Sequence, residues 1–181
     1  MNLNSETTLV EAAQNGHLES FGALYERYHS SMVALAYSML ADRDLAEDAA
    51  QDAFAIACRD IGSLKSKERF AAWLAGICRN TARQMLRSKG KFVARNVRAA
   101  AGNTGIEEHR KDALRRAVWQ LRPNERELIV LRYYNNLPYE RIAQVLDISI
   151  QAVNGRLIRA KRKIAEHLKR NGFTGCDYEN A

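Results

Sequence analysis

The chain has 181 residues, 46% of them apolar, with two prolines and ten glycines, a composition typical of a folded and largely helical protein. Residues 1–87 contain nine Lys and Arg against eleven Asp and Glu, a net charge of −2, whereas residues 88–181 contain 19 against ten, a net charge of +9. The basic second half therefore predicts contact with phosphates, and the acidic first half predicts a different kind of partner. The start, MNLNSETTLVEAAQNGH, lacks the basic and apolar regions of a signal peptide, and no apolar run approaches the ~18 residues of a membrane span. The sequence thus predicts a cytoplasmic protein without membrane insertion.

Four helices are expected between residues 5 and 88. Helical spacing of apolar residues is found in SETTLVEAAQNG, LESFGALYERYHSSMVALAYSML, ADRDLAEDAAQDAFAIACRDI and RFAAWLAGICRNTARQMLRSK. The first is expected to be capped by Ser5 or Thr7, and the third by Asp42 or Asp44. The third helix has an acidic face with Glu47, Asp48 and Asp52, and GSLKSKE forms a loop before the fourth. The fourth helix is apolar on one side and carries on the other side Arg79, Asn80, Arg83 and Arg87.

Residues 89–110 lose the apolar rhythm and gain Gly, Asn and charge, which predicts a flexible linker. Further helices are expected in RKDALRRAVWQL and, after Pro123, in NERELIVLRYYNN. The sequence therefore predicts an all-α fold with two small helical domains, 5–88 and 111–171, the linker between them, and a tail at 172–181.

The stretch YERIAQVLDISIQAVNGRLIRAKRK, residues 139–163, predicts a helix-turn-helix in the second domain. Asp147 and Ser149 favour a turn and an N-cap between two short amphipathic runs. The second run has an apolar stripe from Val153 to Leu168 and a basic opposite face, and in a helix-turn-helix its first turns face base edges in the major groove. The alternative is an ordinary helical hairpin with a solvated basic face.

The three cysteines do not indicate a metal site or a disulfide framework. Cys58, Cys78 and Cys176 are widely spaced, and the first two lie in apolar-periodic segments, which predicts small core residues. The chain also lacks the ExxH pairs of a helical metal-carboxylate enzyme and shows no nucleophile–base arrangement and no phosphate-binding glycine loop. We therefore expect no enzymatic activity, no cofactor and no metal.

Three motifs in order resemble the extracytoplasmic-function sigma factors of bacterial RNA polymerase. DLAEDAAQDAF is similar to conserved region 2.1–2.2 of that family, RFAAWLAGICRNTARQMLR to region 2.3–2.4, and LRPNERELIVLRYYNNLPYERIAQVLDISIQAVNGRLIRAKRKI to region 4. The resemblance covers most of residues 8–170. It implies a non-catalytic subunit that binds core polymerase, directs it to a two-part promoter and assists DNA melting. Its implied partners are the clamp of the largest polymerase subunit, promoter DNA and an anti-sigma factor.

The resemblance also implies three sets of site residues. Contact with the clamp maps onto Asp48, Gln51 and Asp52. Capture of the melted promoter strand maps onto the fourth helix and the loop before it, with Lys65, Lys67, Trp73, Arg79, Asn80, Arg83 and Arg87. Recognition of the upstream element maps onto the helix-turn-helix, with Ser149, Gln151, Asn154, Gly155, Arg156, Ile158, Arg159, Arg162 and Lys163.

Several alternatives stay open at the level of sequence. The acidic face has a second explanation in the helix macrodipole, which accounts for Asp42 and Asp44 better than for Asp52. Trp73 suits a core role and a stacking role equally, and Gly155 indicates either close approach of DNA or drift. The family usually has Asp where this chain has Gln84, which leaves its preference at the melted element open. A stand-alone helix-turn-helix regulator is the rival function, and it would leave the acidic face unused.

Overall fold

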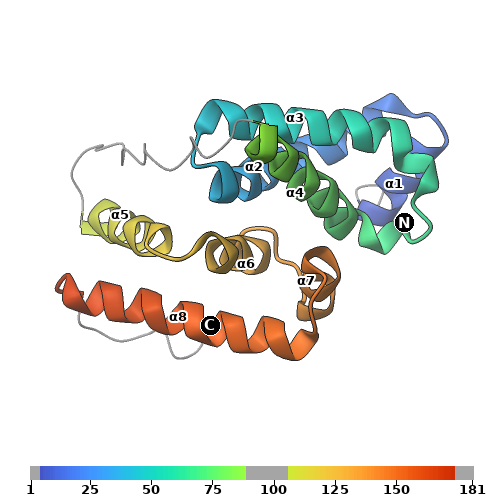
Figure 1. Cartoon of the computed structure of the whole chain (residues 1–181). Helices are drawn as coiled ribbons and strands as arrows, with labels where there is room; N and C mark the ends of the chain where they lie inside the picture. The colour runs from blue at the N-terminus through green and yellow to red at the C-terminus, as the bar shows by residue number, and fades with distance from the viewer. Residues whose placement is uncertain (1–4, 89–105, 174–181) are drawn as a thin grey trace.

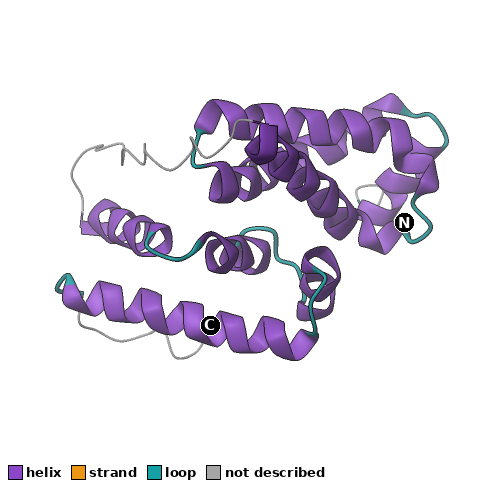
Figure 2. Ribbon diagram, in the orientation of Figure 1, coloured by secondary structure: helices purple, strands orange, loops and turns teal. Residues whose placement is uncertain are grey.

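The computed structural model describes residues 5–88 and 106–173, and every regular element in those two ranges is helical (Figure 2). The N-terminal group of helices comprises α1 (Glu6–Gln14), α2 (Leu18–Leu40), α3 (Arg43–Asp60) and α4 (Phe70–Ser88), with two 3-10 turns before α4, η1 (Ile61–Ser63) and η2 (Lys67–Arg69). The C-terminal group comprises α5 (Ile106–Trp119), α6 (Pro123–Tyr133), α7 (Tyr139–Leu146) and α8 (Ile150–Arg170). The all-α fold expected from the sequence is confirmed.

Side-chain caps explain where several of these helices begin. The hydroxyl of Ser5 accepts a hydrogen bond from the backbone N–H of Thr8 at 3.2 Å, and the carboxylate of Asp42 accepts one from Leu45 at 3.1 Å. Such bonds satisfy N–H groups that the first turn of a helix leaves without partners. Of the caps left open by the sequence, the structure therefore selects Ser5 and Asp42. Pro123 occupies the first position of α6, where its missing N–H costs nothing.

The N-terminal group packs around α2, which contacts α1, α3 and α4, and α3 also contacts α4. The face of α3 turned inward consists mainly of small side chains, because Ala46, Ala49, Ala53 and Ala57 are all fully buried. Small side chains let two helices approach closely. The aromatic side chain of Phe70, at the start of α4, is fully buried.

The prediction for the cysteines holds for one residue and is wrong for the other. Cys78 is buried in α4, and its burial raises the pKa of the thiol to about 12. Cys58 is exposed on α3. The reason lies in helix geometry. The buried face of α3 is centred on its alanines, and Phe54 lies at the edge of that face. Cys58 follows Phe54 by four residues, which is a further 40° around the helix, so it points outward.

Within the C-terminal group, α8 contacts α5, α6 and α7. The tight turn between α7 and α8 begins at Asp147, whose backbone is left-handed (φ 55°), a conformation that Asp tolerates better than most residues. Ser149 then caps α8, because its hydroxyl accepts a hydrogen bond from the N–H of Ala152 at 3.1 Å. The expected helix-turn-helix is therefore present as α7 and α8.

The two groups of helices lie against each other, through α2 with α6 and α4 with α7 (Figure 1). Most of their buried apolar side chains form one continuous cluster, and Ala113, Ala117 and Leu168 form a second, small one between α5 and α8. Residues 89–105 of the predicted linker and 174–181 of the predicted tail lie outside the described residues, whereas residues 106–110 belong to α5. None of the helices in the described ranges has the length and apolar character needed to cross a membrane.

Candidate nucleic-acid interface

Of the acidic residues on α3, Glu47 is half-buried and its carboxylate lies 3.3 Å from His29. The residues predicted to contact the clamp, Asp48, Gln51 and Asp52, are exposed and lie opposite the buried alanines, and the acidic face refers to these three from here on. None of these three side chains takes part in an ion pair with another described residue. At 100° per residue the three side chains fall within about 100° of the helix circumference, so they form one continuous polar patch. Asp42 caps the helix, so capping explains that residue and not the acidic face.

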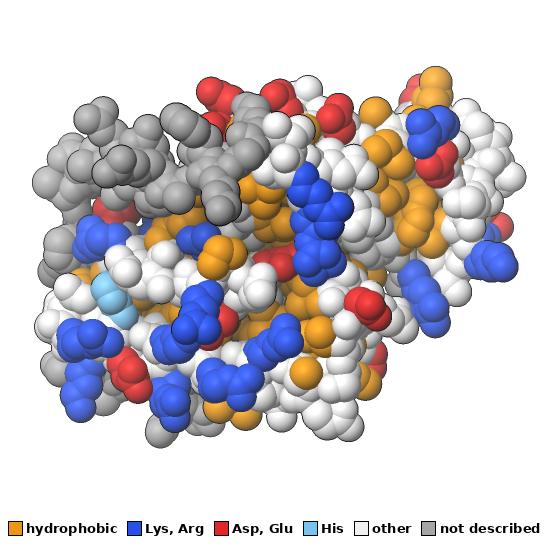
Figure 3. Space-filling view, viewed as in Figure 1, with side chains coloured by type: hydrophobic (Ala, Val, Ile, Leu, Met, Phe, Trp, Pro, Cys, Tyr) orange, Lys and Arg blue, Asp and Glu red, His pale blue; other side chains and the backbone are white. Residues whose placement is uncertain are grey.

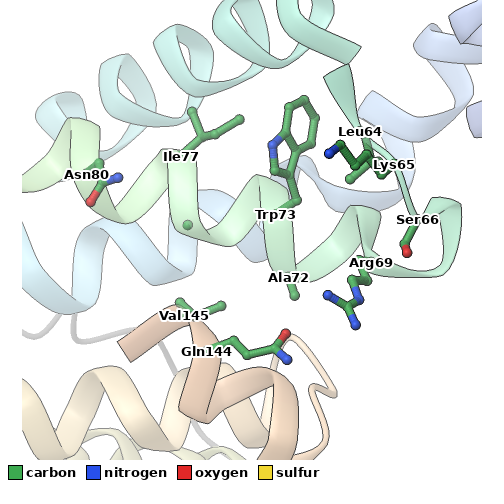
Figure 4. A pocket seen from close by; sticks show the side chains of 11 residues that line it. Leu64, Lys65, Ser66, Arg69, Ala72, Trp73, Ile77, Asn80, Gln144 and Val145 are labelled. Atoms are coloured by element: carbon green, nitrogen blue, oxygen red, sulfur yellow. The ribbon is translucent and has the colours of Figure 1, made fainter. Parts of the chain in front are cut away.

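An open cavity of about 560 Å³, called here the α4 cleft, is lined by α4, the loop before it and α7 (Figure 4). Three of the residues predicted to bind the melted strand line it together: Lys65 from the loop before α4, and Trp73 and Asn80 from α4 itself. Trp73 is half-buried, and its ring centroid lies 6.0 Å from that of Phe70. Its indole thus belongs both to the edge of the core and to the cleft. Gln144 and Val145 of α7 line the cleft on the side of Ala72, whereas Trp73 and Ile77 extend from the other side of α4 (Figure 4).

The other residues predicted for the melted strand lie elsewhere. Lys67 is in η2, where its ammonium group forms an ion pair with Glu11 of α1 at 2.7 Å. Arg83 and Arg87 are exposed on the later turns of α4 and do not line the cleft. Arg69 was not predicted but does line the cleft. Its position in the basic run KSKER was the signal that could have identified it.

Arg79 is the residue whose surroundings differ most from the expected solvent-facing position. Its guanidinium forms an ion pair with the carboxylate of Glu127 in α6, and the two side chains are only 10% and 5% exposed. A buried charge needs a partner that compensates for its lost hydration. Here the guanidinium and the carboxylate compensate for each other. Glu127 was not predicted, because it lies 48 residues away in the other group of helices.

A second surface is formed by the outer side of α8. The side chains of Gln151, Asn154, Ile158 and Arg159 are exposed, and Lys and Arg side chains gather along α8 at the lower edge of Figure 3. The remaining predicted positions are also accessible: Ser149, Arg162 and Lys163 are exposed, and Gly155 and Arg156 are half-buried.

Two of the basic residues on α8 are held by carboxylates. The ammonium group of Lys163 lies 2.6 Å from Glu125 of α6, and the guanidinium of Arg162 lies 3.7 Å from Glu166. Partial burial alone would raise the pKa of Glu125, but the hydrogen bonds that it accepts from Lys163 and from the backbone of Arg122 outweigh this effect and lower that pKa. Glu125 therefore orients Lys163 at the edge of the surface.

Gly155 has no packing reason inside the described part of the chain. A Cβ atom built there would meet its nearest neighbour, an Nη of Arg159, at 3.5 Å, an ordinary van der Waals contact. A helix-interior glycine costs about 1 kcal/mol relative to alanine. The two explanations from the sequence, close approach of DNA and drift, therefore both stand.

The comparisons with known proteins identify the family of the chain. Residues 24–92 match the family Sigma-70 region 2, and residues 111–164 match the family Sigma-70, region 4. The chain is 30% identical over 170 residues to the ECF RNA polymerase sigma factor BldN of Streptomyces coelicolor, covering 88% of this chain and 64% of that protein. The chain belongs to the extracytoplasmic-function sigma factors of bacterial RNA polymerase.

Other sigma factors match this one over nearly their whole length. The RNA polymerase sigma-H factor of Pseudomonas aeruginosa is 29% identical over 178 residues, covering 89% of this chain and 92% of that protein. Among solved structures, CnrH in complex with the cytosolic domain of CnrY has a TM-score of 0.69 and 28% identity, covering 92% of this chain and 98% of that one. As a sigma factor, the protein serves promoter recognition by RNA polymerase at the initiation of transcription.

Proposed function

We propose that this sigma factor divides promoter recognition between its two groups of helices, with the α4 cleft holding a melted strand and α8 holding the upstream duplex. The observation that carries the proposal is the convergence of Lys65, Trp73 and Asn80 on one cleft. Single-stranded DNA requires cations for its phosphates and planar or hydrogen-bonding groups for unstacked bases, and these three side chains supply all of them.

The acidic face of α3 is the proposed contact with the clamp of the largest polymerase subunit. It is exposed, compact and not engaged in ion pairs with other described residues, which suits docking on a basic helical partner. It also lies on α3 and not on α4 or α8, so polymerase and DNA would bind different helices.

On α8, Arg156 and Arg159 are the proposed base-reading residues, since Arg pairs bidentately with guanine, and Asn154 would pair with adenine. Arg162 and Lys163 are the proposed phosphate contacts. Lys163 is held by Glu125, which fixes its ammonium group at the edge of the recognition surface.

An anti-sigma factor is the proposed regulator, because the sigma factor RpoE of Bartonella quintana, whose fold this chain shares with a TM-score of 0.68, was solved in complex with the anti-sigma factor NepR. The protein would act in the cytoplasm with RNA polymerase, as an initiation factor without catalytic activity of its own.

The proposal is tested on strand opening. Holoenzyme carrying Asn80→Ala is expected to form closed promoter complexes normally but to open them less, because Asn80 is exposed in the cleft and contributes nothing to the core. Permanganate reactivity of unpaired thymines measures opening, and a premelted bubble template should restore wild-type complex formation. Loss of closed-complex binding as severe as the loss of opening would contradict a role for the cleft in melting.

A further inference from the structure

The loop before α4 brings a lysine to the α4 cleft without an ion pair to hold it there. Leu64, Lys65 and Ser66, called here the cleft loop, lie between η1 and η2 and line the cleft together (Figure 4). Lys65 is exposed, and its ammonium group takes part in no ion pair with the residues that the structure describes. The position of Lys65 therefore depends on the backbone of the cleft loop.

The side chain of Gln14, at the end of α1, holds that backbone. Its Nε2 donates hydrogen bonds to the carbonyl oxygens of Ile61 at 3.0 Å and of Leu64 at 2.9 Å. Only the NH2 end of the amide can face two carbonyls, because its oxygen is an acceptor. The carbonyl of Leu64 belongs to the same planar peptide group as the N–H and Cα of Lys65. The bond from Gln14 therefore fixes the plane that carries the start of the Lys65 side chain.

A second contact joins α1 to the other end of the cleft loop. Glu11 lies three residues before Gln14, on the same side of α1, and its carboxylate pairs with Lys67 at 2.7 Å. Lys67 directly follows the cleft loop. The Glu11 side chain is 61% exposed, and an exposed ion pair contributes little by itself. The two hydrogen bonds of Gln14 are therefore the main hold of α1 on the loop.

α1 is itself fixed to the N-terminal group, beside the turns that precede α4 (Figure 1). Leu9 and Val10 are buried, and the hydroxyl of Tyr28 in α2 donates a hydrogen bond to the carboxylate of Glu6. Burial, and then this bond, raise the pKa of Tyr28 above its usual range, so the hydroxyl remains a donor at neutral pH. The Tyr28 ring also lies 5.7 Å, between centroids, from that of Phe70 in α4. A helix anchored in this way provides a fixed support for the loop.

We propose that Gln14 is a positioning residue for strand capture, which holds the cleft loop through two backbone carbonyls so that Lys65 faces the melted promoter strand. This inference rests on the proposed role of the α4 cleft. Gln14 does not line the cleft, so its effect passes through Lys65 and not through a DNA contact of its own. A loop that is held in place before binding avoids the cost of being ordered by the strand. Loss of the two bonds should therefore lower strand opening and leave closed-complex binding unchanged.

The decisive variants change the hydrogen-bond donors at position 14 of the full-length chain. Gln14→Met keeps a similar length but has no donor, whereas Gln14→Lys keeps donors for both carbonyls. Asn15→Ala is the matched control, because it removes an exposed amide from the end of the same helix. Glu11→Gln is a second variant, which loosens the other end of the cleft loop from an exposed position and leaves the core untouched. Circular dichroism verifies that each variant keeps its helical content.

Each chain is assembled with core polymerase, and permanganate reactivity gives the share of closed promoter complexes that open. Gln14→Met is expected to lower the closed-to-open equilibrium by about tenfold, the low end for the loss of one hydrogen bond to a charged group. Glu11→Gln should lower it by a smaller factor, and Gln14→Lys and Asn15→Ala should match wild type. In a Lys65→Ala chain, Gln14→Met should cause no further loss, because two residues that act through one contact are not additive.

The outcomes separate the positioning role from the role of the cleft. Normal opening with Gln14→Met, in a series where Lys65→Ala impairs opening, would overturn the positioning role and leave the proposed function standing. A loss that Gln14→Lys does not restore, or that recurs in full in the Lys65→Ala chain, would show that Gln14 serves the fold in general and would also overturn it. Normal opening with Lys65→Ala would overturn the proposed part of Lys65 in strand binding, and the inference with it.

Discussion

Replacing Asp48 and Asp52 by asparagine is expected to weaken binding of the chain to core RNA polymerase by at least about 30-fold, the low end for breaking a charge pair across an interface. Both carboxylates are exposed on α3, opposite its buried alanines, and neither takes part in an ion pair with the described residues. Their replacement by isosteric amides leaves no cavity and no buried group without a partner. The loss should therefore appear in binding and not in folding.

The matched control is Glu19→Gln with Glu26→Gln on α2, which removes the same two charges from exposed positions away from the acidic face. Core affinity is measured by fluorescence anisotropy of labelled chain, and thermal unfolding by circular dichroism. An equal loss of affinity in the control would show that the effect comes from net charge and not from contacts made by the acidic face. A marked drop in the melting temperature of the α3 variant would show that these residues serve the fold.

The second large effect is expected on α8. Arg156→Ala or Arg159→Ala should change base preference within the upstream element by about 1–3 kcal/mol, which is roughly 5- to 150-fold, because a bidentate arginine distinguishes guanine from the other bases. Arg162→Ala should weaken binding to all sequences alike and reduce the salt slope by about one unit, as expected for a phosphate contact. Neither change touches the buried stripe of α8, which includes Val153 and Leu157.

This prediction is measured by selecting holoenzyme-bound DNA from a library randomised in the upstream element, at several salt concentrations. Arg170→Ala, in the last turn of α8, provides the control and should alter neither preference nor salt slope. If neither Arg156→Ala nor Arg159→Ala shifts the selected sequence, α8 does not read bases through these two residues.

Local features of the sequence were sufficient to predict the helices and to narrow the caps of the first and third to two residues each. Asp42 and Ser149 carry short oxygen acceptors in front of amphipathic runs, and both were found as caps. The acidic face and the exposed side of α8 were predictable for the same reason, since helical periodicity alone places a side chain inside or outside. The error at Cys58 arose because lying in an apolar-periodic segment does not place a residue on its buried face, which in α3 is centred on alanines.

Contacts between distant segments were not predictable in this way. Arg79 and Asn80 both fall on the polar face of α4. Nothing in the neighbouring sequence indicates that Arg79 is buried against Glu127 whereas Asn80 stays exposed. Lys67 was grouped with Lys65 by its place in the loop, but its partner Glu11 lies on α1. Such pairs depend on how helices far apart in the chain pack together, which a single sequence does not reveal.

The central claim is that this chain reads promoters as a polymerase subunit and not as an independent regulator. The most direct measurement is a gel-shift comparison, across a salt series, of the full-length chain alone and in complex with core polymerase on one promoter selected by in vitro transcription. The chain alone should bind weakly and with little selectivity, since its helix-turn-helix reads only a few base pairs, whereas the holoenzyme should bind tightly and selectively because polymerase links the two DNA-binding surfaces on one promoter. Equally tight and selective binding by the free chain would contradict the account and identify a self-sufficient DNA-binding regulator.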